Sequence, residues 1–241
     1  MDKSEKIYRT NMIRHFKEEW FSLFEEFICS TDFKTIVSTV RKEKETKGVV
    51  PNDEERALMF KAFREVSPPL VRCVILGSSP YSQKGRFDGL AYSNGRNLVQ
   101  DISKELSIIL DEVSRSYPKN NSKGIALTEY LPEDLRRWTE QGVLLINKAF
   151  TVIEGEDNSH IQLWEPFTKY WITRFSETHP NVCWLLIGED VQSVTPFIKR
   201  GHIINTKSLT DKATVYPFSG SNCFVEVNSY LTDIGKGKIL W

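Results

Sequence analysis

The six residues from Val71 to Leu76 constrain the fold most, because this largely apolar, β-branched run ends abruptly in a loop. Gly77, Pro80 and Gly85 punctuate that loop, and glycine and proline are typical of the turns that follow a strand. In open α/β sheets, ligands bind where parallel strands end in such loops. This stretch therefore predicts a buried strand whose carboxyl end carries a ligand-binding loop.

Three more apolar runs, at 143–146, 182–187 and 202–205, read as strands and alternate with amphipathic segments. Such alternation predicts an α/β fold: a central four-stranded parallel sheet flanked by helices, with an N-terminal helical extension. We expect the extension over 1–49 and the α/β domain over 50–241. Helices are predicted at 4–45 with a break at 30–32, 51–66, 102–113, 132–141, 164–175 and 191–199.

Composition narrows the functional classes. The chain has 32 basic and 32 acidic residues among 241, so no overall positive charge attracts nucleic acid, although a local basic groove is compatible with this balance. The four cysteines form no Cys-x-x-Cys pair, and neither a disulfide framework nor a zinc site is expected. We expect no cofactor, no membrane association and a monomer. The cytoplasm is the expected compartment, or the nucleus where the host has one.

Two motifs lie in and after the first loop. Gly77-Ser-Ser-Pro-Tyr81 and Gly89-Leu-Ala-Tyr-Ser93 resemble the Gly-Gln-Asp-Pro-Tyr and Gly-Leu-Ala-Phe-Ser motifs of the family 1 uracil-DNA glycosylases. The resemblance continues in the same order over roughly 50–241, at 138–147, 159–160, 164–168, 184–188 and 218–224. It implies the fold of that family and a pocket for a flipped-out uracil.

The resemblance assigns roles to the pocket. Tyr81 matches the aromatic residue that excludes the C5 methyl group of thymine, and Tyr92 matches the residue that stacks on the base. Asn147 matches the amide that donates to O4 and accepts from N3 of uracil. The predicted site residues are Ser78, Ser79, Tyr81, Tyr92 and Asn147 for the base and Ser82, Gly188, Thr210 and Lys212 for DNA.

Two positions depart from the family pattern. Breaking the glycosidic bond requires negative charge near a cationic sugar and a donor at the leaving base. Ser79 stands where the family has its catalytic aspartate, and Ser208 where it has its catalytic histidine. Glu189 and Asp190 also follow Gly188, where carboxylates repel a phosphate.

Three hypotheses follow. The leading one is a catalytically inactive or severely impaired homologue that binds single-stranded or uracil-containing DNA. The first alternative is an active DNA glycosylase with altered catalytic residues or substrate, for which Asp88 and Asp211 are candidate carboxylates, although solvated loop aspartates explain both more simply. The second alternative is a protein-interaction scaffold whose nucleic-acid face has been given to a protein partner.

Overall fold

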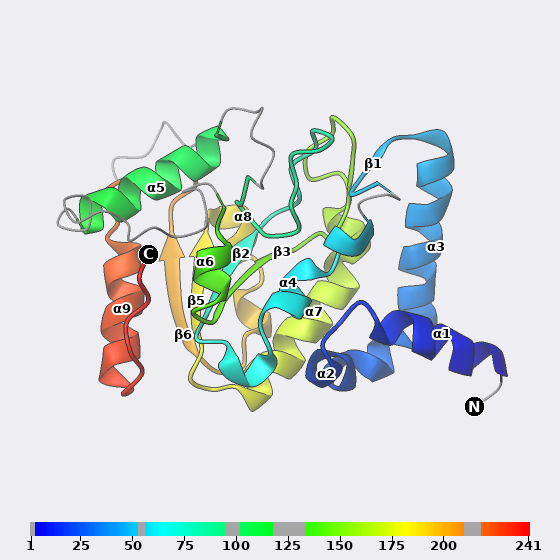
Figure 1. Cartoon of the computed structure of the whole chain (residues 1–241), viewed down its shortest axis with the longest axis horizontal. Helices are drawn as coiled ribbons and strands as arrows, with labels where there is room; N and C mark the ends of the chain where they lie inside the picture. The colour runs from blue at the N-terminus through cyan, green and yellow to red at the C-terminus, as the bar shows by residue number, and fades with distance from the viewer. Residues whose placement is uncertain (1–2, 53–55, 95–101, 118–133, 210–217) are drawn as a thin grey trace.

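A four-stranded parallel sheet in the order β3-β2-β5-β6 forms the centre of the computed structural model (Figure 1). The structure describes residues 3–52, 56–94, 102–117, 134–209 and 218–241. The strands are β2 (Cys73–Gly77), β3 (Val143–Asn147), β5 (Cys183–Ile187) and β6 (His202–Thr206). The predicted α/β fold and its four parallel strands are confirmed.

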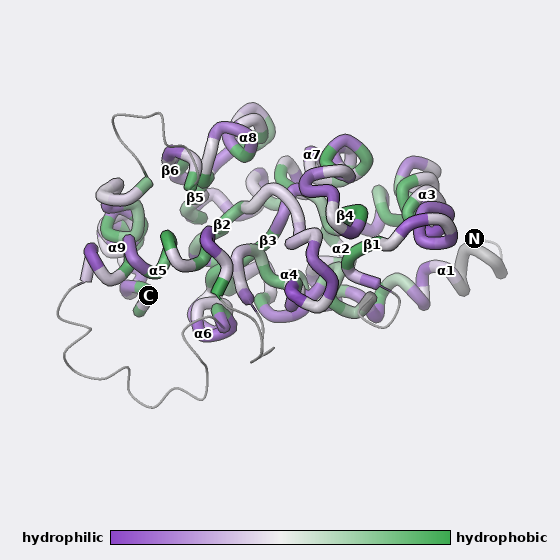
Figure 2. Tube along the Cα trace, turned by 90° about the horizontal axis from the view of Figure 1, so that it is seen from above, coloured by the Kyte–Doolittle hydropathy of each residue, from purple (hydrophilic) through white to green (hydrophobic). Residues whose placement is uncertain are grey.

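Helices cover both faces of this sheet because alternate side chains of each strand point to opposite sides. On β5, Trp184 stacks on Trp171 of α7 (Ile161–Thr178) with ring centroids 6.0 Å apart. On the other face, Trp138 of α6 (Arg136–Thr139) packs 5.9 Å from Phe224 of α9 (Cys223–Asp233). Figure 2 shows α7 and α9 on opposite sides of the strands. The neighbouring helix α5 spans Lys104–Ser116.

Three helices precede the sheet: α1 (Lys3–Ile13), α2 (Glu18–Ile28) and α3 (Thr31–Thr46). Ser30 caps α3 by accepting a hydrogen bond from the backbone N–H of Phe33, as the predicted break requires. Trp20 contacts Phe175 of α7 at 4.9 Å between ring centroids, and Phe24 contacts Phe167 at 5.7 Å. The N-terminal helices and the sheet thus share one core. The boundary at residue 49 stays a prediction.

A small second sheet joins the N-terminal region to the loop after β3. Strand β1 (Val49–Val50) pairs antiparallel with β4 (Val152–Ile153), and the N–H of Glu154 donates to the carbonyl oxygen of Gly48 at 2.9 Å. The sequence analysis did not predict this pair, because strands of two residues carry no periodic signal. The pairing fixes the chain just before residues that border the candidate site.

Two of the predicted helices, at 51–66 and 191–199, are wrong, because the described part of each segment contains only shorter helical pieces. Among the described residues of 51–66, only α4 (Lys61–Glu65) and a 3₁₀ turn, η1 (Arg56–Leu58), are helical; the next turn, η2, spans Pro68–Leu70. Segment 191–199 divides into α8 (Glu189–Gln192) and η4 (Thr195–Phe197), because Pro196 cannot supply the N–H that a continuing helix needs. None of the helices that the structure describes is long and apolar enough to cross a membrane.

Candidate functional site

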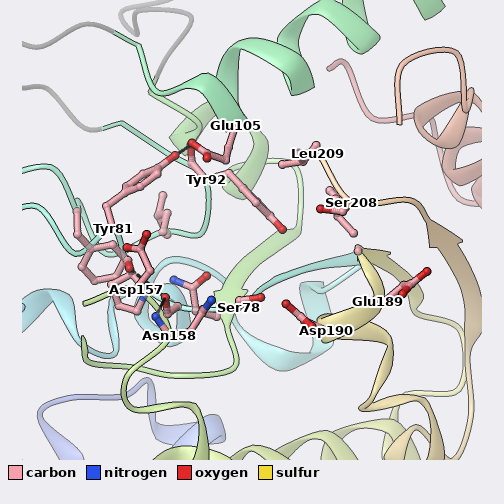
Figure 3. A pocket seen from close by; sticks show the side chains of 17 residues that line it. Ser78, Tyr81, Tyr92, Glu105, Asp157, Asn158, Glu189, Asp190, Ser208 and Leu209 are labelled. Atoms are coloured by element: carbon pink, nitrogen blue, oxygen red, sulfur yellow. Dashed lines mark hydrogen bonds between the residues drawn. The ribbon is translucent and has the colours of Figure 1, made fainter. Parts of the chain in front are cut away.

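A pocket of about 600 Å³ opens at the carboxyl ends of the four parallel strands. Residues directly after β2, at the end of β3, after β5 and after β6 all reach it, as expected for a ligand site in an open α/β sheet. Of the predicted base-binding and catalytic positions, the following line it (Figure 3): Ser78, Ser79, Tyr81, Tyr92, Asn147 and Ser208. Gly188, a predicted DNA contact, lines it too.

Asn147 is the most enclosed polar side chain of this pocket. It is the last residue of β3, pairs in register with Gly77 of β2, and is only 7% exposed. Its side-chain amide forms no hydrogen bond with another described residue. The amide borders the pocket, so its donor and its acceptor are accessible to a bound molecule. The position is therefore suited to a ligand that offers both an acceptor and a donor.

Two tyrosines form an aromatic wall of the pocket. The hydroxyl of Tyr81 donates to the carbonyl oxygen of Tyr92 at 3.0 Å and lies 2.7 Å from Oγ of Ser103, the N-cap of α5. Tyr92 adopts a left-handed backbone conformation, φ +64°, and its hydroxyl donates to the carbonyl oxygen of Leu76 at 3.4 Å. Burial raises the pKa of both phenols, so both rings are neutral near pH 7. The hydrogen bonds hold the two rings in defined positions.

The Ser79 hydroxyl is already partly engaged. Its oxygen accepts a hydrogen bond from the backbone N–H of Asn158 at 3.3 Å, and its proton points to the carbonyl oxygen of Pro80 at 3.2 Å. One lone pair remains with which the oxygen can hold a water molecule. The side chain is neutral, so it contributes no charge to the pocket.

Several carboxylates line this pocket and give it negative charge. The sequence analysis had identified two of them, Glu189 and Asp190. In the described part of the chain, four carboxylates line the pocket: Glu105, Asp157, Glu189 and Asp190. Glu189 and Asp190 begin α8, immediately after Gly188, the residue between β5 and this helix. Asp157 and Asn158 lie in the loop after β4, beside the matched Ser159-His160, and that motif was the signal that could have identified them.

Asp88 does not line the pocket. One carboxylate oxygen accepts from the N–H of Leu90 at 3.0 Å and the other from Oγ of Ser93 at 2.6 Å. Lys61 donates to its carbonyl oxygen at 2.8 Å, and burial is the main cause that raises the pKa of this carboxyl group. Asp88 therefore braces its own loop, where its carboxylate is hydrogen-bonded and half-buried, so the expectation of a solvated loop aspartate is wrong for this residue.

The remaining predicted contacts are dispersed or not described. Ser82 does not line the pocket; its carbonyl oxygen accepts a hydrogen bond from the N–H of Gly155 at 3.1 Å. Thr210, Asp211 and Lys212 lie outside the described residues. The described part of the chain contains no cluster of three or more histidine, cysteine or acidic residues arranged to hold a metal ion.

Comparisons of this sequence with known proteins all match uracil-DNA glycosylases. The sequence model of the uracil DNA glycosylase superfamily matches residues 63–231. The chain is 30% identical over 228 residues to a uracil-DNA glycosylase of Borrelia turicatae, covering 92% of this chain and 96% of that protein. It is 28% identical over 253 residues to the uracil-DNA glycosylase of varicella-zoster virus, covering 96% and 80%.

A solved structure agrees with the fold. The crystal structure of mimivirus uracil-DNA glycosylase superposes with a TM-score of 0.76 at 23% identity, covering 94% of this chain and 87% of that one. A variant of the mimivirus protein in complex with UGI gives the same TM-score.

Proposed function

Because this chain belongs to the uracil DNA glycosylase superfamily, we propose that it recognises uracil in DNA and removes it by hydrolysis of the glycosidic bond. The observation that carries the proposal is the convergence of Tyr81, Tyr92 and Asn147 on one pocket. The names of the two relatives support excision over loss of activity, because the similarity to each covers at least four fifths of both chains.

The pocket has the chemistry needed to read uracil. An asparagine amide can donate to O4 and accept the N3 proton, whereas cytosine presents a donor and an acceptor in the reverse order. The Tyr81 ring excludes a methyl group at C5, and the Tyr92 ring offers a stacking face. A base read in this way must first leave the helix stack, which costs least in single-stranded DNA.

The acidic rim favours single strands for a second reason. Glu189 and Asp190 are exposed at the mouth of the pocket, and a duplex brings more phosphates toward them than a single strand does. We therefore propose single-stranded, uracil-containing DNA as the preferred substrate. The protein-interaction alternative stays a prediction from the sequence.

A second candidate function is uracil binding without excision. The neutral hydroxyls of Ser79 and Ser208 in the pocket favour it, because removing a group that stabilises transition-state charge commonly costs about 10²–10³ in rate. In that case the pocket binds uracil-containing DNA and releases it unchanged. The two candidates predict the same binding preference and differ only in the chemical step.

Single-turnover excision separates them. Protein in large excess is incubated with a labelled single strand that contains one uracil, and abasic sites are then cleaved with alkali. We expect product that is absent with thymine in the same position and absent with the Asn147→Ala variant. No product after hours, together with retained uracil binding, would overturn excision and support the binding candidate.

A further inference from the structure

Among the described residues, four carboxylates line the pocket in which Ser79 stands at the family's aspartate position. Hydrolysis of a glycosidic bond builds positive charge on the sugar, and a nearby carboxylate stabilises that charge. The carboxylate that stabilises the sugar cation must lie near the sugar, and its charge must not be offset by a neighbouring cation. The surroundings of the four carboxylates distinguish them (Figure 3).

Two of the carboxylates have cations close by. Oε1 of Glu189 lies 3.7 Å from Nζ of Lys207. Asp190 belongs to the same helix turn, and its carbonyl oxygen accepts a hydrogen bond from Nζ of Lys148 at 2.6 Å. These lysines offset part of the charge on that side of the pocket.

A third carboxylate, Glu105, lies on α5 and faces the aromatic wall. Its charge adds to the effect of burial that raises the pKa of Tyr81 and of Tyr92. It is therefore close to the rings that would enclose a base. This places Glu105 on the base side of the pocket.

Asp157 differs from these three. It is exposed, and its side chain forms no hydrogen bond or ion pair with another residue in the described part of the chain. The next residue, Asn158, donates its backbone N–H to Oγ of Ser79 at 3.3 Å. Asp157 is thus one residue from a direct contact with Ser79, and Figure 3 shows it near Tyr81 and Asn158, across the pocket from Glu189.

The loop that carries Asp157 is fixed at several points. The N–H of Gly155 donates to the carbonyl oxygen of Ser82, and the N–H of Ile153 donates to Oγ of Ser159 at 2.8 Å. Asn158 adopts a left-handed conformation, φ +61°, that turns the chain back at this point. A catalytic group needs such support to hold its position.

We propose that Asp157 supplies the negative charge that Ser79 lacks, an inference that rests on the proposed function. The bond between C1′ and N1 breaks, both electrons leave with the uracil, and the carboxylate of Asp157 stabilises the sugar cation. A water held by Ser79 then attacks C1′ and gives one proton to Asp157, which passes it to solvent. The uracil anion takes up a proton from water, so the products are uracil and an abasic sugar.

The first test is single-turnover excision with matched variants. We expect Asp157→Asn to slow excision by about 10²-fold or more. The control is Glu156→Gln, because Glu156 is a neighbouring exposed carboxylate that does not line the pocket. The excision rate of this control should stay within about twofold of that of the unaltered protein. An Asp157→Asn protein as fast as the unaltered protein would overturn the inference and leave the proposed function intact.

A second test measures the effect of the Asp157 charge on binding, without excision of a base. Two oligonucleotides are compared. One carries a pyrrolidine in place of the sugar, and the protonated nitrogen of this ring mimics the sugar cation; the other carries a neutral tetrahydrofuran. We expect the protein to bind the pyrrolidine oligonucleotide at least about tenfold more tightly, and we expect this preference to be lost in Asp157→Asn and kept in Glu156→Gln. If the unaltered protein excises nothing but shows this preference, the proposed function fails and the charge assignment stands. Equal binding of both probes would overturn the assignment.

Discussion

The amide oxygen of Asn147 lies so close to Gly77 that any side chain on that glycine would occupy the same space. The two residues are register partners at the ends of β3 and β2. Gly77 therefore does more than end a strand: its missing side chain leaves room for the amide that faces the pocket. This relationship places Asn147, which we propose to read the base, at the edge of the sheet.

We predict that Gly77→Ala abolishes selective binding of uracil-containing DNA. A methyl group at position 77 displaces the Asn147 amide, and the overpacked site also destabilises the fold by about 1–3 kcal/mol. Binding is measured by fluorescence anisotropy and stability by urea unfolding. The matched control is Gly237→Ala, because the nearest atom to a Cβ there, Nη2 of Arg72, is 4.0 Å away. Unchanged uracil selectivity in Gly77→Ala would contradict the role given to this contact.

A second prediction concerns the exclusion of thymine. In Tyr81→Ala the C5 side of the pocket opens, and the preference for uracil over thymine should fall at least about tenfold, or 1.4 kcal/mol. Tyr81→Phe keeps the ring but loses the hydrogen bonds to Tyr92 and Ser103. It should retain the preference and lose about 0.5–1.5 kcal/mol of stability. Loss of selectivity in the phenylalanine variant as well would show that the ring is not the selective element.

The acidic rim should weaken DNA binding. We predict that Glu189→Gln tightens binding of single-stranded DNA, most at low salt, because it removes repulsion between a carboxylate and phosphates. Glu177→Gln, exposed on α7 away from the pocket, serves as the control for a change of net charge. Affinity is measured across a salt series. Equal effects of the two variants would mean that the rim does not approach the DNA.

The fold should become less stable in mild acid because of His160. Nδ1 of this buried imidazole lies 2.8 Å from Oγ1 of Thr151, which already accepts the Trp164 indole N–H. With its proton on Nε2, toward Glu43, the neutral imidazole accepts a hydrogen bond from the Thr151 hydroxyl at Nδ1. Burial lowers the pKa of His160, although Glu43, 2.9 Å from Nε2, opposes the shift.

The sign of the pH effect follows from this lowered pKa. The unfolded chain takes up the proton near pH 6.5 and the folded chain only at lower pH, so the free energy of unfolding falls as pH drops below about 6.5. Burial also lowers the pKa of His179, so the test compares the unaltered protein with His160→Gln. The variant should show a shallower decline in urea midpoint between pH 7 and 5. Identical declines would exclude a contribution from His160.

The sequence predicted the four strands well because each is a short apolar run between polar segments. The grouping of Tyr81, Tyr92 and Asn147 in one pocket was predicted from the resemblance of their motifs to those of the uracil-DNA glycosylases, and the structure brings all three to the pocket. Local patterns alone predicted only a ligand-binding loop at the carboxyl end of a strand.

Strand and helix patterns alone could not identify Asp157. It lies in an exposed loop without periodicity, two residues before the matched Ser159, and its neighbour Asn158 reaches Ser79 through a hydrogen bond that spans 79 positions of the chain. Helix α9 was missed as well. Its N-cap, Asn222, adopts a left-handed conformation and provides no side-chain cap, so the usual start signal is absent.

The most direct test of the central claim is the affinity for a single strand containing one 2′-fluoro-deoxyuridine, compared with the same strand bearing the 5-methyl base. The fluorine disfavours the sugar cation and keeps the strand intact, so binding is measured without turnover. The pocket formed by Tyr81, Tyr92 and Asn147 predicts at least about tenfold tighter binding of the uracil strand, and loss of this preference in Asn147→Ala. Equal affinity for the two strands would contradict uracil recognition by this protein.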